Sequence, residues 1–382
     1  MGIDTGIGVF LDVLALRTSS RHHSPMDHVQ FMHRCLELAT LGRRHVGNGA
    51  MVGAVLVRDG KIIAEGFHEG FGKGHAERML LQNFDQEIQQ NDVLYVNLEP
   101  CCHTGKTPPC TDIILKRGVK HVVYGLGDPD PLVAGKGIEI LRQQGVTVTG
   151  PFLRTQCERL NRGFLSLRRN NRPYITLKMS KTKDGLISNP DKSPLKITSQ
   201  EQDIWSHTFL RNEADAILVG VSTIVFDNPK LNTRLAQKNT TNFNGALNMN
   251  SKLLNKKIDH VETFRVILDP HFRIPVNAQV VTDEILHRTI ILINKDAEDR
   301  KKVEELRRRG VKVMEVPADD QGFVWSEIWK TLTTPAGDFY GIGSILVEGG
   351  ERTWEMFREA GVVDEEVTLI GERYYQVVPA GL

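Results

Sequence analysis

His75-Ala76-Glu77 is followed further along the chain by Glu99-Pro100-Cys101-Cys102-His103-Thr104-Gly105-Lys106-Thr107-Pro108-Pro109-Cys110. The imidazole of His75 and the thiolates of Cys101 and Cys110 are three soft ligands. Such a set suits zinc with a fourth position left open for water. Glu77 lies two residues beyond His75, where its carboxylate can carry protons to and from a metal-bound water. These stretches therefore predict a zinc site with a general acid/base beside it.

Two other interpretations of the same residues stay open. A closed structural zinc site would need a fourth protein ligand, which Cys102 or His103 could supply. Without metal, the cysteines would be small buried hydrophobes. The order His-x-Glu, Pro-Cys and a later Cys is typical of zinc deaminases, although the usual two residues between the cysteines are eight here. We therefore favour a catalytic zinc over a structural one, and either over no metal.

Strand patterns alternate with helical patterns around these ligands. A helical period begins at Met26 and ends before Gly42, and further helices are expected from His75, from Cys110 and over 138–141. Apolar runs predict strands at 52–57, 61–66, 93–98, 121–125 and 146–148, with Asp59-Gly60 as a hairpin turn. Alternation of this kind predicts an α/β sheet covered on both faces, with His75 and Glu77 at its end.

A second alternating block follows a polar boundary. Its predicted strands lie at 174–179, 216–220, 264–268, 289–293 and 344–347, and the Asn- and Thr-rich residues 236–251 are expected to form a surface loop. We predict a non-native or disordered extension at 1–25, with Met26 as the natural start. The zinc-site domain is expected at 26–150 and a second α/β domain at 174–382. Residues 151–173 are expected to form a linker, with a connecting helix from Cys157 to Leu167 followed by a polar run from Arg168 to Pro173.

The composition excludes several classes of protein. Lysine and arginine number 48 against 47 acidic residues, and no basic block is present, so a large nucleic-acid footprint is not indicated. No apolar run is long enough to cross a bilayer. The five cysteines are odd in number and gather around a metal-type motif, which favours a reducing cytoplasm over a disulfide framework.

The motifs together resemble one family, the bifunctional riboflavin-biosynthesis deaminase/reductases. In the first block they are the two stretches quoted above and Asp128-Pro129-Asp130-Pro131-Leu132-Val133-Ala134-Gly135-Lys136-Gly137. In the second block they are the run from Lys178 to Gly185, Asp227-Asn228-Pro229-Lys230-Leu231-Asn232-Thr233-Arg234, and Val347-Glu348-Gly349-Gly350. The resemblance implies a cytidine-deaminase-like three-layer α/β/α domain with zinc, followed by a dihydrofolate-reductase-like α/β domain.

The resemblance also implies two reactions on one small-molecule, ribonucleotide-like substrate. The first half would hydrolytically deaminate 2,5-diamino-6-(5-phosphoribosylamino)pyrimidin-4(3H)-one with a zinc-activated hydroxide and Glu77 as acid/base. The second half would reduce the ribosyl group to ribityl with NADPH. We expect a cytoplasmic homo-oligomer that binds neither nucleic acid nor membrane.

Residue roles carry over position by position. In the deaminase half, substrate contacts would come from His68, His103, Lys106 and Asp128, and Lys106 suits a phosphate as a compact charge. In the reductase half, the substrate would meet Arg211, Leu231, Arg234 and Glu348. The cofactor would meet Ser180, Lys196, Thr223, Asp227, Gly349 and Gly350. The full Rossmann fingerprint is absent, so cofactor binding rests on the resemblance.

Three departures from the family pattern leave alternatives open. The family's Pro-Asn-Pro falls on Asn48-Gly49-Ala50, so its substrate-holding Asn falls on Gly49. Its Ser-x-Trp falls on Pro194-Leu195-Lys196. The chain also stops soon after residues 367–370, where the family continues, so lost strands and an exposed sheet edge are expected. The alternatives are a deaminase with a degenerate reductase domain, a deaminase of free or tRNA bases, and a structural zinc module in an interaction protein.

Overall fold

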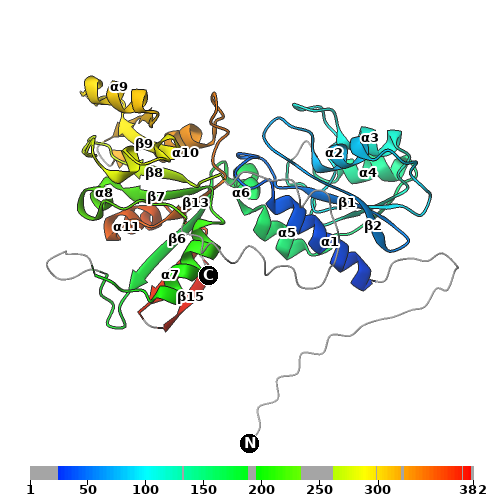
Figure 1. Cartoon of the computed structure of the whole chain (residues 1–382), viewed down its shortest axis with the longest axis horizontal. Coiled ribbons are helices and arrows are strands. Elements are labelled where there is room, and N and C mark those ends of the chain that lie inside the picture. The colour runs from blue at the N-terminus through cyan, green and yellow to red at the C-terminus, as the bar shows by residue number, and fades with distance from the viewer. Residues whose placement is uncertain are drawn as a thin grey trace, which may run out of the picture.

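The computed structural model describes residues 25–130, 133–187, 195–233, 261–297, 299–319, 322–371 and 373–379. These residues form two α/β halves that lie next to each other, each with its own sheet (Figure 1). The predicted extension, apart from Pro25, and the predicted loop at 236–251 lie outside the described residues. The two-domain α/β architecture predicted from the sequence is confirmed.

The N-terminal sheet has the order β2(Lys61–Phe67), β1(Gly53–Arg58), β3(Val93–Val96), β4(His121–Tyr124) and β5(Thr147–Thr149). β1 runs antiparallel to β2 and β3, whereas β3, β4 and β5 are parallel. Helix α1(Pro25–Thr40) lies against β1 so closely that a Cβ on Gly53 would be 2.1 Å from the carbonyl oxygen of Cys35. Glycine is thus required for this contact.

Helices cover both faces of this sheet, which gives the predicted three layers. On the face opposite α1 lie α2(Ala76–Asn83), α3(Cys110–Lys116) and α4(Lys136–Gln143). The central strand β3 is a fully buried apolar run, as expected of a strand between two helical layers, whereas the edge strands β2 and β5 are partly exposed. Loops that follow the ends of β2 and β3 lead into α2 and α3, which brings His75 and Cys110 to one edge of the sheet.

Residues 151–173, predicted as a linker, contain two helices, α5(Arg154–Leu160) and α6(Arg162–Asn170). Cys157 of α5 and Phe164 and Leu165 of α6 are buried in the N-terminal core. Much of this segment therefore packs as part of the N-terminal half, and the exact domain boundaries stay predictions.

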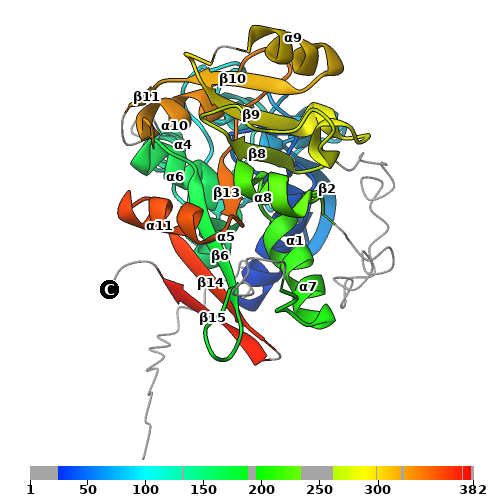
Figure 2. The ribbon, with the colours of Figure 1, turned by 90° about the vertical axis from the view of Figure 1, so that its left-hand side faces the viewer.

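The C-terminal sheet has the order β10-β9-β8-β7-β13-β6-β14-β15, which Figure 2 shows from top to bottom. All pairs are parallel except the last. The bounds are β6(Tyr174–Lys181), β7(Ala216–Gly220), β8(Phe264–Leu268), β9(Thr289–Asn294), β10(Lys312–Val316), β13(Ser344–Val347), β14(Glu365–Ile370) and β15(Arg373–Pro379).

Alternate residues of the central strands point to opposite faces of the sheet and pack into two separate hydrophobic cores. In β7, Ala216 and Leu218 pack with α10(Trp325–Thr333) and α11(Glu351–Glu359). Ile217 and Val219 pack on the other face, with α8(Val221–Asp227) and α9(Arg300–Arg309). The remaining elements are α7(Gln200–Ser206), a π-helical turn His207–Arg211, two 3-10 turns Gln279–Val281 and Leu286–Arg288, and the hairpin β11(Ala318–Asp319) and β12(Gly322–Phe323).

From the sequence, the sheet is predicted to lose its strands after Ile370, and this prediction is wrong for residues 373–379. Residues 373–379 form β15, which pairs antiparallel with β14 from Glu365 to Ile370. The outer edge of β14 is therefore covered by backbone hydrogen bonds rather than exposed.

The two halves meet at the amino ends of the C-terminal parallel strands. The Arg44 guanidinium donates to the carbonyls of Asn212 at 2.6 Å and Val261 at 2.9 Å, just before β7 and β8. A Cβ on Gly163 would lie 2.8 Å from the backbone of Gly343, which precedes β13. Glycines on both sides thus allow α6 to approach this edge of the sheet.

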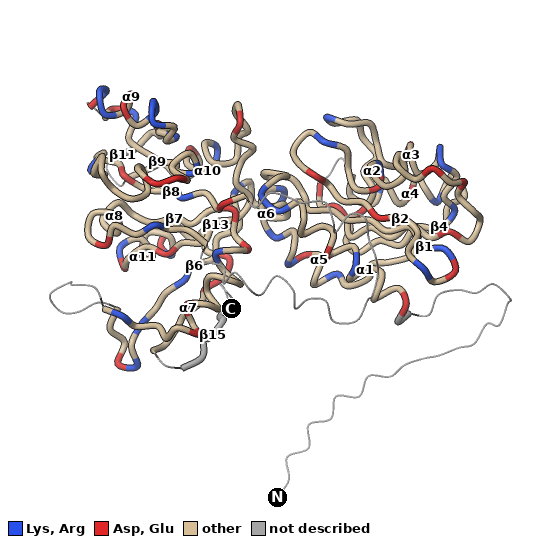
Figure 3. The backbone as a smooth tube through the Cα atoms, in the orientation of Figure 1, with Lys and Arg blue, Asp and Glu red and all other residues tan. Residues whose placement is uncertain are grey.

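Charges of both signs are interspersed over the two halves, as Figure 3 shows for the described residues. Among these residues, helix α9 stands out for its lysines and arginines. Within the same described part of the chain, every helix is too short or too polar to cross a bilayer.

Candidate active sites

His75, Cys101 and Cys110 converge at the end of the N-terminal sheet. The Nδ1 atom of His75 lies 3.4 Å from Sγ of Cys101 and 3.5 Å from Sγ of Cys110. One ligand atom from each of the three residues falls within 4.8 Å of the others, and neither Cys102 nor His103 belongs to this group. Three soft donors at this spacing fit a zinc ion with an open fourth position.

Local backbone structure places each ligand. His75 is the N-cap of α2, and Cys110 is the first residue of α3. The carbonyl of Cys101 accepts the backbone N–H of Cys110 at 3.0 Å, and the Cys101 sulfur accepts the same N–H at 3.4 Å. The loop between the two cysteines is therefore closed on itself, and its length does not separate the ligands.

The protonation of the cluster suits metal binding. Hydrogen bonds from Cys110 and His75 outweigh burial and lower the pKa of Cys101 to about 4, so this sulfur is a thiolate at neutral pH. Burial raises the pKa of Glu77 to about 7, although the nearby His75 acts in the opposite direction. Glu77 is 3% exposed and lies on the first turn of α2, beside the cluster. A carboxyl group with this pKa can both accept and donate a proton near neutrality.

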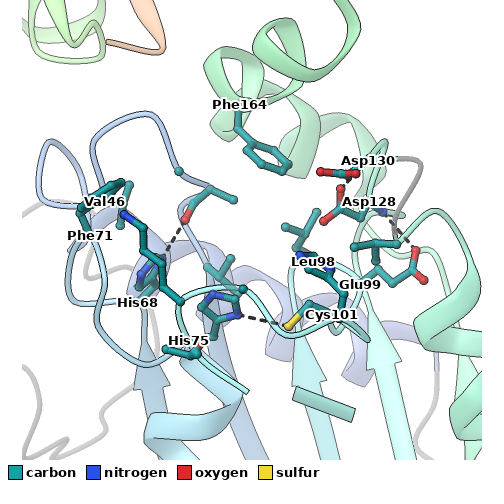
Figure 4. Close-up of a pocket in the computed structure, with 18 of the residues that line it drawn as sticks. Val46, His68, Phe71, His75, Leu98, Glu99, Cys101, Asp128, Asp130 and Phe164 are labelled. Atoms are coloured by element: carbon teal, nitrogen blue, oxygen red, sulfur yellow. Dashed lines mark hydrogen bonds between the residues drawn. The ribbon is translucent and has the colours of Figure 1, made fainter. Parts of the chain in front are cut away.

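A cavity of about 270 Å³ opens above the cluster. In Figure 4, His75 and Cys101 lie at its floor, His68 and Phe71 on one side, Asp128 and Asp130 on the other, and Phe164 of α6 opposite. All four residues predicted to contact the deaminase substrate line it, namely His68, His103, Lys106 and Asp128. The structure thus brings these residues together around the zinc-type cluster.

Two of these lining side chains keep buried atoms without a hydrogen-bond partner. They are Nε2 of His68 and Nδ1 of His103. Burial, and then the neighbouring His75, lower the pKa of His68, so its ring is neutral at physiological pH. Burial raises the pKa of Asp128 to about 6. Unpaired polar atoms in a cavity indicate a polar ligand that would complete their hydrogen bonds.

Gly49, the position at which the family resemblance places a substrate-holding asparagine, also lines this cavity together with Asn48 and Ala50. The Asn48 side chain does not simply replace the missing asparagine. Its Nδ2 donates to the carbonyl of Thr333 in the C-terminal half at 2.7 Å. At this departure from the family pattern, the Asn48 side chain makes a hydrogen bond between the two halves.

Glu99 is a site residue that sequence reasoning missed. Its carboxylate accepts the backbone N–H groups of Asp128, Gly135, Gly137 and Ile138 at 3.0–3.3 Å. A Cβ on Gly137 would lie 2.1 Å from the carbonyl oxygen of Pro100. Glu99 thus fixes the loop that carries Asp128 against the loop that carries Cys101.

Replacing Glu99 with alanine is expected to lower the free energy of unfolding of the N-terminal half by about 3 kcal/mol, because four backbone donors, two of them in fully buried hydrogen bonds, lose a charged acceptor. Thermal unfolding followed by circular dichroism measures this change. The matched control is Glu139→Ala on the exposed face of α4, which should change stability by no more than about 0.5 kcal/mol. Equal melting temperatures for the two variants would contradict the role of Glu99.

The predicted reductase residues Arg211 and Glu348 form a half-buried ion pair. The Arg211 guanidinium donates to Glu348 Oε2 through Nη2 at 2.6 Å and through Nε at 3.0 Å, and its Nη1 donates to the Asn232 carbonyl at 3.0 Å. Burial alone would raise the pKa of Glu348, but the charges of Arg211 and Lys178 dominate and lower it to about 2. Arg211 is thus already engaged by protein acceptors. Lys178, near Glu348, was not among the predicted site residues.

The other predicted reductase residues take different places. The Oγ of Ser180 on β6 is buried and has no hydrogen-bond partner, and the same is true of the Oδ1 of Asn232. Gly349 and Gly350 lead into α11, where a Cβ on Gly349 would lie 2.6 Å from Thr353. Thr223 and Asp227 lie on α8. Leu231 packs in the core beneath that helix, Lys196 pairs with Asp203, and Arg234 lies outside the described residues.

Each half of the chain is similar to a known protein family. A family described as the cytidine and deoxycytidylate deaminase zinc-binding region matches residues 25–126, and the RibD C-terminal domain matches 173–371. The riboflavin biosynthesis protein RibD of Aquifex aeolicus is 36% identical over 343 residues, which cover 90% of this chain and 86% of that protein. The corresponding protein of Actinobacillus pleuropneumoniae is 33% identical over 345 residues, covering 90% and 84%.

Solved structures show the same arrangement over nearly the whole chain. Acinetobacter baumannii RibD superposes with a TM-score of 0.71 at 28% identity, covering 92% of this chain and 88% of that one. A diaminohydroxyphosphoribosylaminopyrimidine deaminase/5-amino-6-(5-phosphoribosylamino)uracil reductase from Thermotoga maritima gives the same TM-score and coverage at 30% identity.

The fold and the sites define a two-domain enzyme in which a zinc-dependent deaminase half is joined to a reductase half. The zinc-binding region fits the His/Cys/Cys cluster, and the reductase domain is of the NADPH-dependent type. The chain belongs to the RibD family of riboflavin biosynthesis proteins.

Proposed function

We propose that the chain deaminates 2,5-diamino-6-(5-phosphoribosylamino)pyrimidin-4(3H)-one and then reduces the ribosyl group of the product to ribityl with NADPH. The observation that carries this proposal is the convergence of His75, Cys101 and Cys110 beside the buried Glu77, in a cavity whose other walls hold unpartnered polar atoms. The similarity to RibD proteins over 90% of the chain supports the choice of substrate.

In the deaminase half, His75, Cys101 and Cys110 would hold a zinc ion, which would supply Lewis acidity and make water nucleophilic at neutral pH. Glu77 accepts the proton that the attacking water gives up and later delivers it to the departing amino group as ammonia. A pKa of about 7 allows this carboxyl group to take part in both steps. The water oxygen bonds to the ring carbon and the bond from that carbon to the amino nitrogen breaks. One water proton leaves with the ammonia, and the other ends on the adjacent ring nitrogen as the carbonyl forms.

The substrate is oriented by the other walls of the cavity. The neutral His68 and the unpartnered Nδ1 of His103 are available to polar atoms of the pyrimidine ring. Lys106, on the exposed loop between the cysteines, provides a positive charge for the phosphate. Asp128 accepts hydrogen bonds when ionised and donates one when protonated, and its pKa of about 6 makes both forms accessible.

In the reductase half, NADPH supplies the hydride. The unpartnered Oγ of Ser180, the Gly349-Gly350 turn and Thr223 and Asp227 on α8 would hold the dinucleotide. Glu348 is ionised and close to Lys178, so a carboxylate and an ammonium are available to hydroxyl groups of the sugar. We assign Arg211 the task of holding Glu348, because its guanidinium is taken up by that carboxylate.

The partners, the cellular location and the oligomeric state of the enzyme are also part of this proposal. The interspersed charges of the described residues support a small-molecule substrate and no nucleic-acid partner. Five cysteines, none of them in a disulfide among the described residues, support a cytoplasmic location. We also propose a homo-oligomer with a deaminase domain at 26–150, a linker at 151–173 and a reductase domain at 174–382.

A two-stage assay of the purified chain tests the proposed function. Incubation with the diaminopyrimidine substrate should release ammonia, and adding NADPH should then give oxidation of the cofactor in proportion to the ammonia formed. A chelator should abolish the first signal and leave the second intact when the deaminated product is supplied. Ammonia release without NADPH oxidation would favour a degenerate reductase, and neither signal would favour a structural zinc module.

Replacing Arg211 with alanine is expected to lower kcat/KM of the reductase step roughly tenfold to a hundredfold, because a buried carboxylate loses its partner. Ammonia release by the deaminase half is the internal control and should not change. A reductase rate equal to that of the wild type would contradict the assignment of Arg211.

The same variant should change the acid stability of the C-terminal half. The pKa of Glu348 is about 2 in the folded chain against an ordinary value of 4.5, so its stabilisation is complete above the ordinary value and is lost as the pH falls toward 2. Without Arg211 the folded pKa should rise. Acid unfolding of Arg211→Ala, followed by tryptophan fluorescence, is therefore expected to begin at a higher pH than that of the wild type.

A further inference from the structure

A stack of three side chains connects the C-terminal half to the mouth of the deaminase cavity. The ring of Tyr340 stacks on the ring of Phe71, with centroids 4.7 Å apart and planes inclined by 16°. The Nζ atom of Lys106 lies 3.2 Å from the centroid of the Phe71 ring. Because an ammonium at that distance and a stacked ring cannot share one face, Phe71 is held between Lys106 and Tyr340.

Backbone contacts hold the three loops of this stack together. The N–H of Phe71 donates to the carbonyl of His45 at 2.9 Å, and the N–H of Asn48 donates to the carbonyl of Tyr340 at 3.0 Å. Gly47 has a φ of 61°, and a Cβ there would lie 2.3 Å from the Tyr340 carbonyl oxygen. The loop over 45–48 is therefore the common support of Phe71 and of Tyr340.

The geometry of this stack bears on the deaminase cavity rather than on the reductase site. Asn48, Phe71 and Lys106 all line the cavity above the zinc-type cluster. Tyr340 precedes β13, at the amino ends of the parallel strands, whereas Glu348 follows β13 at the opposite end. Tyr340 is 40% exposed and is not part of either core of the C-terminal half.

We propose that Tyr340, a residue of the reductase half, is a positioning residue for the deaminase, because it fixes Phe71 and through it the ammonium of Lys106 at the cavity mouth. The inference rests on the proposed phosphate-binding role of Lys106. A lysine on an exposed loop samples many rotamers when free, and ordering it costs affinity at the moment of binding. The stack keeps the charge in place before the substrate arrives, so part of the deaminase site is supplied by the other domain.

Steady-state deamination by Tyr340→Ala and Tyr340→Phe tests this role. The alanine variant is expected to raise KM for the phosphoribosyl substrate roughly threefold to tenfold, with kcat unchanged, since one aromatic stack is lost. The phenylalanine variant keeps the stack and should retain the wild-type KM. Zinc content and NADPH oxidation on the deaminated product report that both halves remain folded. A wild-type KM for Tyr340→Ala, or an equal rise in KM for both variants, would overturn the proposal.

Two further variants separate this inference from the proposed function. Lys106→Ala should raise KM by itself, and adding Tyr340→Ala to it should have no further effect, because both changes act through one ammonium. If Lys106→Ala leaves KM unchanged, the proposed role of Lys106 fails. If Lys106→Ala raises KM and Tyr340→Ala does not, only the role of Tyr340 fails. The matched control is Phe226→Ala on α8, an aromatic side chain that is 76% exposed and should leave deamination unchanged.

Discussion

Replacing Glu77 with glutamine is expected to lower kcat of deamination at least about a hundredfold while one zinc per chain stays bound. The substitution keeps the shape of the side chain but removes its ability to accept a proton. His75, Cys101 and Cys110 are unchanged, so the metal site should stay intact. Ammonia release together with metal analysis of the same sample measures both parts of this prediction.

The control for Glu77 is a glutamate that does not line the cavity. Glu87 is exposed in the loop before β3, and Glu87→Gln should deaminate at the wild-type rate. Reduction of the deaminated product by Glu77→Gln should also be normal. Deamination at the wild-type rate by Glu77→Gln would mean that another group moves the proton.

Replacing Cys110 with alanine is expected to remove zinc and to lower deamination at least about a thousandfold, since Lewis-acid activation of water contributes several kcal/mol. Two protein ligands are too few for a stable zinc site of this type. Atomic absorption of the dialysed protein should find much less than one zinc per chain, and NADPH oxidation on the deaminated product should persist.

Cys102 supplies the matched control for the metal. It is the direct neighbour of Cys101 but is not part of the ligand cluster found in the described residues. Cys102→Ser should therefore keep one zinc per chain and the wild-type rate of deamination. Full zinc in Cys110→Ala, or loss of zinc from Cys102→Ser, would show that the ligand set has been assigned wrongly.

The fold could be predicted largely from local patterns. Strands such as residues 93–96 and 216–219 are short apolar runs between turn signals. This pattern is typical of strands that are buried on both faces of an α/β sheet, so these strands could be predicted. The predicted connecting helix at 157–167 is present as two helices, α5 and α6, but the burial of Cys157, Phe164 and Leu165 in the N-terminal core was not predicted from this polar segment. A narrow apolar face on a polar helix is visible only once its partner surface is known.

The metal cluster was predictable because its ligands lie in two short motifs. Glu99 was missed because its partners are backbone N–H groups some distance along the chain, which leave no mark in the side-chain sequence. Phe71 and Tyr340 were missed for a similar reason, since the two rings meet across the halves and a single aromatic residue in a loop predicts no contact. Arg211 was predicted to contact the substrate, and this role stays a prediction; its ion pair with Glu348 could not be predicted, because the two residues lie far apart in the sequence.

The way in which the two halves abut has a kinetic consequence. The deaminase half contacts the amino ends of the parallel strands, while Glu348 and Gly349 follow the carboxyl end of β13. Within a single chain, the deaminated intermediate therefore has to diffuse out into solvent and around the sheet before it is reduced. NADPH oxidation should show a lag after the diaminopyrimidine is added, and supplying extra Glu77→Gln chains, which reduce but do not deaminate, should shorten that lag.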